Sequence, residues 1–254
     1  MKRMLRSSLS QLFYLGGKCL GQNGKQGVRI LCYHRVNDRE EGYMSVPVKS
    51  FEQQMVFLAE KGYRTISLKA LLDGNAEPKS IVITFDDGYE DNYTNAFPVL
   101  REFGFTATIF CITQKLDTPG YLTRAQIRQM TAAGFSFGSH TLSHPDLRSL
   151  SRREKLREIS SSRVWLEEAL GLACDFFCYP YGLHDEESVQ LVREAGYRGA
   201  CSNAPGANRA GNLDPYRLRR TEVGPADTAD DFKKKLEGAY DFLHQSLHWM
   251  RGRP

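Results

Sequence analysis

A regular alternation of short apolar runs with helix-like segments is the feature that most constrains how this chain can fold. Short apolar runs predict buried strands, and apolar residues that recur every three to four positions predict amphipathic helices. The expected strands are Val28–Tyr33, Tyr63–Ile66, Ser80–Phe85, Thr106–Ile112, Phe135–Gly138, Phe176–Tyr179, Gly199–Cys201 and Arg217–Glu222. Because helices separate them, these strands should pair in parallel through right-handed crossovers. A distorted (β/α) barrel of seven or eight units fits best, with an open doubly wound sheet as the alternative.

Capping residues and periodicity place the intervening helices. We expect one helix capped by Ser50, one from Thr123 to Ala133, and a long one over Ser151–Leu170. Others are expected at Leu68–Leu72, Asn95–Phe103, Glu186–Ala195 and Asp230–Leu247. In the long helix we expect an inward face made of Leu156, Ile159, Val164 and Leu166. No second domain boundary interrupts residues 27–254, so we expect a single barrel domain over that range.

Composition excludes several classes of protein. Of the 254 residues, 41% are hydrophobic and 25% charged, which is typical of a soluble globular chain. The net charge of +4 is mild, and no stacking or zinc-finger pattern accompanies it, so we expect no nucleic-acid partner. The six cysteines show no paired spacing, which favours a reducing compartment. No feature indicates an oligomeric state.

The N-terminal segment, residues 1–26, is basic and amphipathic and ends in a glycine-rich linker. Its apolar run is interrupted by Ser10 and Gln11, so it does not match a secretory signal, and it is too short and polar to span a bilayer. One interpretation is a helix lying on an anionic membrane surface, and the other is a helix packed on its own domain. We therefore expect a cytoplasmic protein, with peripheral contact at the inner membrane as the alternative.

Polar residues that carry chemistry follow the predicted strands directly. Asp86 and Asp87 follow Ser80–Phe85, His140 and His144 follow Phe135–Gly138, and His34 follows Val28–Tyr33. In a barrel the carboxyl ends of the strands open on one face, where active sites assemble. These side chains should therefore share one rim.

The residue types at this rim are those of a catalytic metal site. Alone, Asp86-Asp87 is more typical of an acidic turn, and a single histidine is more often structural. Together, His140 and His144 can converge on a divalent metal if their turn is helical, and Asp87 can be the third ligand. Asp86 would then face the metal's water as a general base. Two imidazoles and one carboxylate leave coordination positions open for water and substrate.

The segment Tyr179-Pro180-Tyr181-Gly182 follows the apolar residues Phe176–Cys178. It is equally consistent with a plain aromatic turn and with part of the site. In the second interpretation the Tyr181 N–H stabilises a developing oxyanion, while Tyr179 and Pro180 help to form a sugar-sized wall.

The chain resembles the polysaccharide deacetylases of the NodB-homology type, carbohydrate esterase family 4. Thr84-Phe85-Asp86-Asp87-Gly88 resembles the first motif of that family, Ser139–His144 the second, and Tyr179–Gly182 the end of the third. The resemblance implies a NodB-like barrel with Asp86 as base, Asp87, His140 and His144 as metal ligands, and Tyr181 contributing its N–H. It also implies one divalent metal, with Zn²⁺ expected first and Co²⁺ or Ni²⁺ as alternatives.

The chain departs from the family pattern in three places. Cys178 stands where the third motif usually has an arginine, and we find no counterpart of the fourth and fifth motifs. The segment Leu31–Val36 instead resembles the opening of the permuted branch that contains poly-N-acetylglucosamine deacetylases, in which this histidine, His34, takes the general-acid place. His184, which follows the aromatic turn, is the rival candidate.

The expected reaction is therefore hydrolysis of an N-acetyl group on an amino sugar of a bacterial-type polysaccharide or its precursor. Two alternatives stay open. One is removal of a formyl or acetyl group from a lipid-linked sugar at the inner membrane, which the basic N-terminal segment would suit. The other is a glycan-binding module that has kept the fold without turnover, although binding alone needs no base beside a metal.

Overall fold

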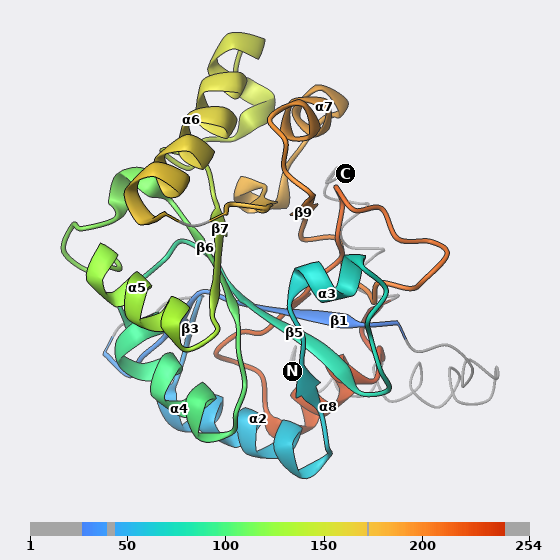
Figure 1. The fold of residues 1–254 in the computed structure, drawn as a ribbon. Helices are drawn as coiled ribbons and strands as arrows, with labels where there is room; N and C mark the ends of the chain where they lie inside the picture. The colour runs from blue at the N-terminus through green and yellow to red at the C-terminus, as the bar shows by residue number, and fades with distance from the viewer. Residues whose placement is uncertain (1–26, 40–43, 172, 242–254) are drawn as a thin grey trace, which may run out of the picture.

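The computed structural model describes residues 27–39, 44–171 and 173–241 and contains a curled parallel sheet (Figure 1). Its strands are β1 (Arg29–Tyr33), β4 (Arg64–Thr65), β5 (Ser80–Phe85), β6 (Thr108–Cys111), β7 (Ser136–Ser139), β8 (Phe176–Cys178), β9 (Gly199–Cys201) and β10 (Thr221–Glu222). The order is β10-β1-β5-β6-β7-β8-β9. Strand β4 pairs with the first residues of β5, and β6 pairs with the last residues of β5, on the same side. Two further strands, β2 (Arg35–Val36) and β3 (Ser45–Val46), form a separate parallel pair. The prediction of a distorted (β/α) barrel is confirmed.

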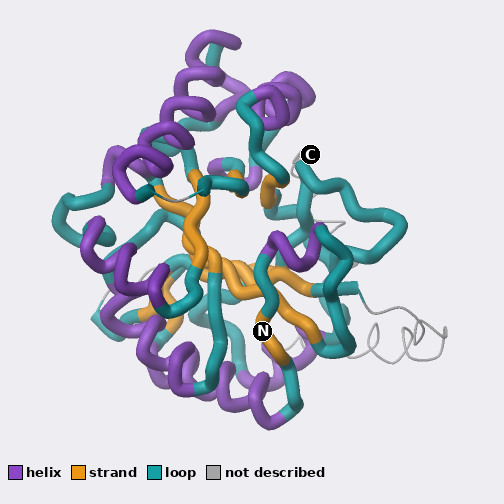
Figure 2. Tube along the Cα trace, viewed as in Figure 1, coloured by secondary structure: helices purple, strands orange, loops and turns teal. Residues whose placement is uncertain are grey.

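Helices surround the sheet (Figure 2), as expected for strands buried on both faces. They are α2 (Val48–Glu60), α3 (Leu68–Leu72), α4 (Phe97–Glu102), α5 (Arg124–Ala132), α6 (Arg152–Leu170), α7 (Glu186–Glu194) and α8 (Ala229–Leu236). A π-helical turn, Asn92–Ala96, precedes α4, so that helical segment begins earlier than we predicted. Thr123 and Ser151 begin α5 and α6 with complete capping boxes, which confirms two of the predicted helix starts.

An irregular last strand closes the barrel. Thr221 and Glu222 pair with Leu31 and Cys32 of β1, while Leu218, three residues before Thr221, bridges Cys201 of β9. The segment 218–222 therefore lies between β1 and β9. Its middle residue, Arg220, is fully buried, so the closure carries a charged side chain into the interior.

Alternation along the strands divides the core into two layers. Inside the barrel, Ile30, Val82, Phe110, Phe176 and Leu218 belong to one apolar cluster. Between barrel and helices, Leu31, Ile83, Phe177 and their neighbours belong to another. Gly138 is required in β7, because a Cβ there would lie 2.7 Å from ring carbons of Phe110 and from the Phe176 carbonyl oxygen. Phe110 thus fills the interior below the mouth, and this barrel is packed like others of its class.

The buried face of α6 differs from the predicted one. Ile159 and Leu166 are buried as expected, but Leu156 and Val164 are 43% and 48% exposed. Lys155 takes an inward place instead, because its ammonium donates to Asp185 at 2.6 Å and to Glu187 at 2.9 Å. A lysine can be buried where its charge is paired with carboxylates. Hydrophobic periodicity does not predict such a buried lysine.

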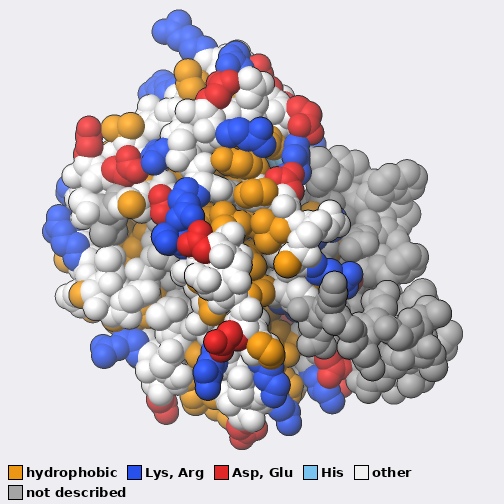
Figure 3. Space-filling model, turned by 45° about the vertical axis from the view of Figure 1, so that its right-hand side comes forward, with side chains coloured by type: hydrophobic (Ala, Val, Ile, Leu, Met, Phe, Trp, Pro, Cys, Tyr) orange, Lys and Arg blue, Asp and Glu red, His pale blue; other side chains and the backbone are white. Residues whose placement is uncertain are grey.

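The surface gives no sign of a large patch of one charge on the face shown in Figure 3, where acidic and basic side chains are interspersed. Among the helices described, none has the length and hydrophobicity needed to span a bilayer. The predicted N-terminal segment, residues 1–26, lies outside the described residues, as does the C-terminal part of the predicted helix Asp230–Leu247. The membrane and localisation predictions therefore stay predictions.

Candidate active site

Three side chains, one that follows β5 and two that follow β7, converge at the mouth of the barrel. His140 Nε2 lies 3.2 Å from His144 Nε2, and each lies 3.6 Å from Asp87 Oδ1. Ligands about 2.0–2.1 Å from a tetrahedral zinc ion stand roughly 3.3–3.4 Å from one another. The three predicted ligands thus have the mutual spacing that one divalent ion requires.

The donor atoms are also in the right chemical state for a metal. Asp87 Oδ1 is buried without a hydrogen-bond partner, so the polypeptide leaves one carboxylate oxygen for another ligand. His140 Nδ1 lies 2.7 Å from the Cys178 carbonyl oxygen and donates to it, which turns Nε2 toward Asp87. Burial lowers the pKa of His140 to about 4 and lowers that of His144 as well, so both imidazoles are neutral near pH 7.

The loop that carries the two histidines is not helical, although the sequence analysis made their convergence conditional on a helical turn. Thr141 and His144 both have left-handed backbone angles, with φ of 68° and 66°. Asp87 and Tyr181 are left-handed too, with φ of 71° and 58°, so four of the six such non-glycine residues described lie at this site. A left-handed backbone is uncommon for residues with side chains, particularly for a β-branched threonine, and such residues cluster at functional sites. Here it bends the loop so that the imidazoles converge without a helix.

Asp86 is held by an arginine that the sequence analysis missed. Arg220 Nη1 lies 2.7 Å from Asp86 Oδ1, and Nη2 lies 2.7 Å from Oδ2. Burial alone would raise the pKa of Asp86, but the charge and hydrogen bonds of Arg220, together with the nearby His140 and His34, outweigh burial, and the net pKa lies well below the ordinary value. Asn203 accepts a further hydrogen bond from Arg220 Nη2 and orients the guanidinium from its other side. Asp86 is therefore an ionised carboxylate in a fixed orientation.

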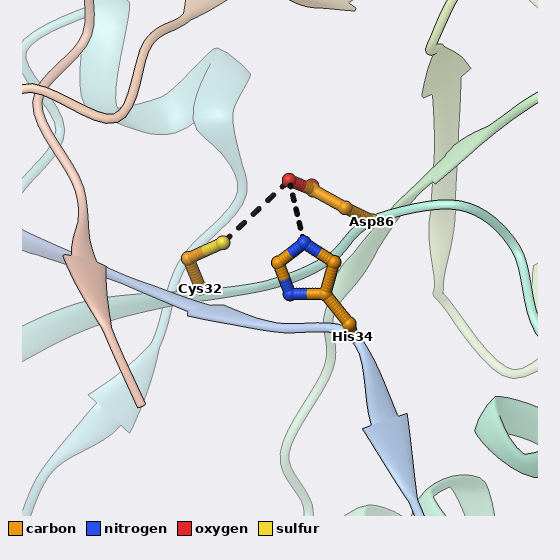
Figure 4. Close-up of side chains that lie close together, drawn as sticks. All are labelled: Cys32, His34 and Asp86. Carbon is orange, nitrogen blue, oxygen red and sulfur yellow. Dashed lines mark hydrogen bonds and ion pairs between the residues drawn. The ribbon is translucent and has the colours of Figure 1, made fainter. Parts of the chain in front are cut away.

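Two thiols complete the surroundings of Asp86. Cys32 Sγ and Cys178 Sγ each lie 3.6 Å from Asp86 Oδ2, and burial raises the pKa of both thiols well above the ordinary value. Cys32, His34 and Asp86 could in principle hold a metal (Figure 4). The two-point contact with Arg220 argues against it, because that cation already neutralises Asp86. We assign this cluster to holding the carboxylate rather than to a second metal.

His34, which we expected to deliver its proton from the side opposite Asp86, lies beside that carboxylate instead. Its Nε2 is 3.8 Å from Asp86 Oδ2 (Figure 4). Its backbone oxygen accepts a hydrogen bond from Asn92. The departing amine of the expected hydrolysis needs a proton donor, and His34 lies within the site. The rival, His184, is 5% exposed, stacks on the Tyr179 ring at 4.6 Å and contacts the Gly182 carbonyl. The geometry therefore favours His34 over His184 as the candidate general acid.

The expected sugar wall needs a correction. Tyr179 is fully buried in the layer between barrel and helices, where its hydroxyl donates to the Tyr216 carbonyl, and Pro180 is buried as well. Neither can offer a ring face to a substrate. Tyr181 can, because it is 52% exposed and its ring packs edge-on against His144, with 4.5 Å between ring centroids. The oxyanion role of its N–H stays a prediction.

The three candidate metal ligands lie beside a buried carboxylate at the carboxyl ends of barrel strands. Three ligands leave coordination positions on the metal open for water and substrate, and this combination defines a metal-dependent hydrolase. The chain belongs to the polysaccharide deacetylase family, whose model matches residues 73–200. That range includes Asp86, Asp87 and both histidines of the triad, but neither His34 nor Arg220.

Three relatives illustrate the family. YxkH of Bacillus subtilis strain 168, a polysaccharide deacetylase by its name, is 32% identical over 213 residues, which cover 82% of this chain and 75% of that protein. The poly-β-1,6-N-acetyl-D-glucosamine N-deacetylase of Staphylococcus aureus strain MSSA476 is 25% identical over 234 residues, covering 84% and 78%. The solved structure of Streptococcus pyogenes deacetylase PplD, in complex with acetate, has a TM-score of 0.76 at 26% identity and covers 84% and 99%. The prediction of a carbohydrate deacetylase is confirmed, and these relatives do not favour its two alternatives.

Proposed function

We propose that this chain removes N-acetyl groups from a polymer of N-acetylglucosamine, using one zinc ion held by Asp87, His140 and His144. The observation that carries the proposal is the convergence of those three ligand atoms next to Asp86, which Arg220 keeps ionised. The polymer is suggested by the Staphylococcus aureus relative, which by its name acts on poly-β-1,6-N-acetyl-D-glucosamine. An exposed Tyr181 beside the metal ligands suits the apolar face of a sugar ring.

Zinc suits this ligand set because two imidazoles and one carboxylate are a common catalytic combination for it, and Co²⁺ or Ni²⁺ could replace it. When bound, the ion polarises the acetyl carbonyl and makes a water molecule more acidic. The remaining chemistry belongs to the side chains around the triad.

Asp86 accepts a proton from the attacking water, whose oxygen forms a bond to the acetyl carbon. The Tyr181 N–H donates to the oxygen on which negative charge develops. As the carbon–nitrogen bond breaks, His34 delivers a proton to the departing nitrogen. The products are acetate and a sugar with a free amine. His34 then regains a proton from Asp86, whose Oδ2 lies 3.8 Å from its Nε2, and both residues return to their starting state.

The test is acetate release from defined glycans. Zinc-loaded protein is incubated with poly-β-1,6-N-acetylglucosamine, with chitooligosaccharide and with N-acetylated and N-formylated lipid-linked sugars, and acetate and formate are measured by mass spectrometry. We expect acetate from the β-1,6 polymer, and an Asp86→Asn variant that binds zinc but releases acetate about 10²–10⁴-fold more slowly. Zinc-loaded protein that binds the glycans and releases no acetate would instead indicate a binding module.

A further inference from the structure

Helix α6 presents two polar side chains, one turn apart, to the loop that carries both histidine ligands. Glu158 accepts three hydrogen bonds from that loop: its Oε2 from the backbone N–H groups of Leu142 at 2.9 Å and Ser143 at 3.0 Å, and its Oε1 from the Ser143 hydroxyl at 2.8 Å. A single carboxylate thus fixes two successive peptide groups between the two ligands. Charge-assisted hydrogen bonds of this kind are stronger than neutral ones.

Ser162, on the same face of α6, supports the start of the loop. Its hydroxyl lies 2.6 Å from the Ser139 hydroxyl, which accepts from Thr141 N–H at 3.1 Å. The Thr141 hydroxyl in turn accepts from His144 N–H at 2.9 Å. A continuous set of polar contacts therefore runs from α6 to the backbone of the second histidine ligand.

The loop needs such support because its path is intrinsically unfavourable. Thr141 and His144 are both left-handed, and a backbone of this kind persists only where surrounding contacts determine it. Without Glu158, the two peptide N–H groups between these residues would lose their acceptor. The 3.2 Å spacing of the two Nε2 atoms would then have to be recovered when a metal binds.

We propose that Glu158 is a positioning residue that shapes the 139–144 loop for metal binding before the metal arrives. The role rests on the proposed metal site, which Glu158 itself does not join. Residues that orient metal ligands typically change metal affinity by about 10–100-fold when replaced. Glu158 acts on the affinity of the site, through the orientation of His144, rather than on the reacting atoms.

Zinc affinity of the full chain, measured by competition with a chromophoric chelator, tests the proposal. Glu158→Ala should weaken zinc binding about 10–100-fold. Glu158→Asp should weaken it similarly, because its carboxylate is one methylene short of the loop. Glu158→Gln should stay within about threefold of the wild type, because its amide oxygen can accept both N–H groups while its nitrogen donates to Ser143. Glu168→Ala, which changes an exposed glutamate of the same helix, is the matched control.

The outcomes separate this role from general stability. A structural role alone would lower the melting temperature of the zinc-free protein and leave the zinc affinity of the folded protein unchanged. Zinc affinities of the Ala and Asp variants within about threefold of wild type, or an equal loss in Glu168→Ala, would overturn the positioning role. If Glu158→Ala does not fold, the Asp and Gln variants carry the comparison. A wild-type protein that binds no zinc would overturn the proposed function itself.

Discussion

Arg220 and Asp86 form a two-point ion pair in the interior of the barrel, with both nitrogen–oxygen distances at 2.7 Å and both side chains almost completely buried. The planar guanidinium matches the two carboxylate oxygens, which fixes the orientation of Asp86 as well as its charge. Since Arg220 lies in the segment that closes the barrel, closure and orientation of the proposed base depend on the same residues.

Removing only one partner of this pair should be costly. Arg220→Met leaves Asp86 buried and unpaired, so we expect a loss of about 3–5 kcal/mol in the free energy of unfolding. That corresponds to a melting temperature lower by roughly 6–20 °C for a domain of this size. The double variant Arg220→Met, Asp86→Asn should recover much of the stability without recovering acetate release, as thermal unfolding and the glycan assay would show. A single variant as stable as wild type would mean that the pair is not buried as described.

Zinc should stabilise the folded protein through the triad. At a concentration about 100 times its dissociation constant, a ligand of the folded state adds about 2.7 kcal/mol to stability. Melting curves with and without zinc should therefore differ by roughly 5–11 °C in the wild type. His140→Ala should abolish this shift, because it removes one of the three ligands. It also removes the hydrogen bond to the Cys178 carbonyl that orients the imidazole. An undiminished shift in the variant would place the zinc elsewhere.

The parts of the site that could be predicted from sequence are those that local rules determine. Asp87 and His140 follow buried strands, and parallel strands in a barrel bring their carboxyl ends to one face. Arg220 could not be found in this way, because it is 134 residues from Asp86 along the chain and buried arginines are rare. One signal was available: in the predicted strand Arg217–Glu222, Arg220 lies two residues after the apolar Leu218 and so shares its inward face.

Strand alternation also explains why Tyr179 was assigned wrongly. Phe176 and Cys178 point into the barrel, so Phe177 and Tyr179 must face the helices. The convergence of His140 and His144 was expected on the condition that their turn is helical, and the structure brings them together without a helix. Left-handed residues produce it, and their conformation depends on tertiary contacts such as those from Glu158, which no local pattern encodes.

The ion pair between α6 and the start of α7 should make stability depend on acidic pH. Burial alone would raise the pKa of Asp185, but hydrogen bonds from Lys155 and Ser188 lower it to about 2. Because the folded pKa lies below the unfolded value of about 3.9, this contribution is present above about pH 4–5 and is lost as pH falls toward 2. Asp185→Asn should flatten the acid limb of stability against pH, measured by urea unfolding. Asparagine keeps the helix cap, and Glu187 still pairs with Lys155, so an unchanged limb would exclude this pair as a cause.

The N-terminal segment can be tested without structural information on it. A chain beginning at residue 27 should keep folding and acetate release from a soluble glycan, because the described barrel begins there. It should lose binding to anionic liposomes if residues 1–26 form the basic amphipathic helix that we predict. Equal sedimentation of both chains with liposomes would discard the membrane interpretation.

The general acid is the remaining assignment, and replacing His34 tests it most directly. An amine is too basic to leave unprotonated. Among the histidines that the structure describes, His34 lies beside Asp86 and is not part of the metal triad. His34→Ala should lower kcat by about 10²-fold or more and flatten the basic limb of the pH–rate profile. Zinc content and melting temperature should hardly change, because the contact with Asn92 involves the backbone oxygen of residue 34 and survives the substitution. His184→Ala should do the reverse, lowering stability through the lost stacking on Tyr179 while sparing kcat. If His184→Ala loses turnover and His34→Ala keeps it, the proton comes from the other side of the aromatic turn, and the similarity to the permuted branch loses its main mechanistic support.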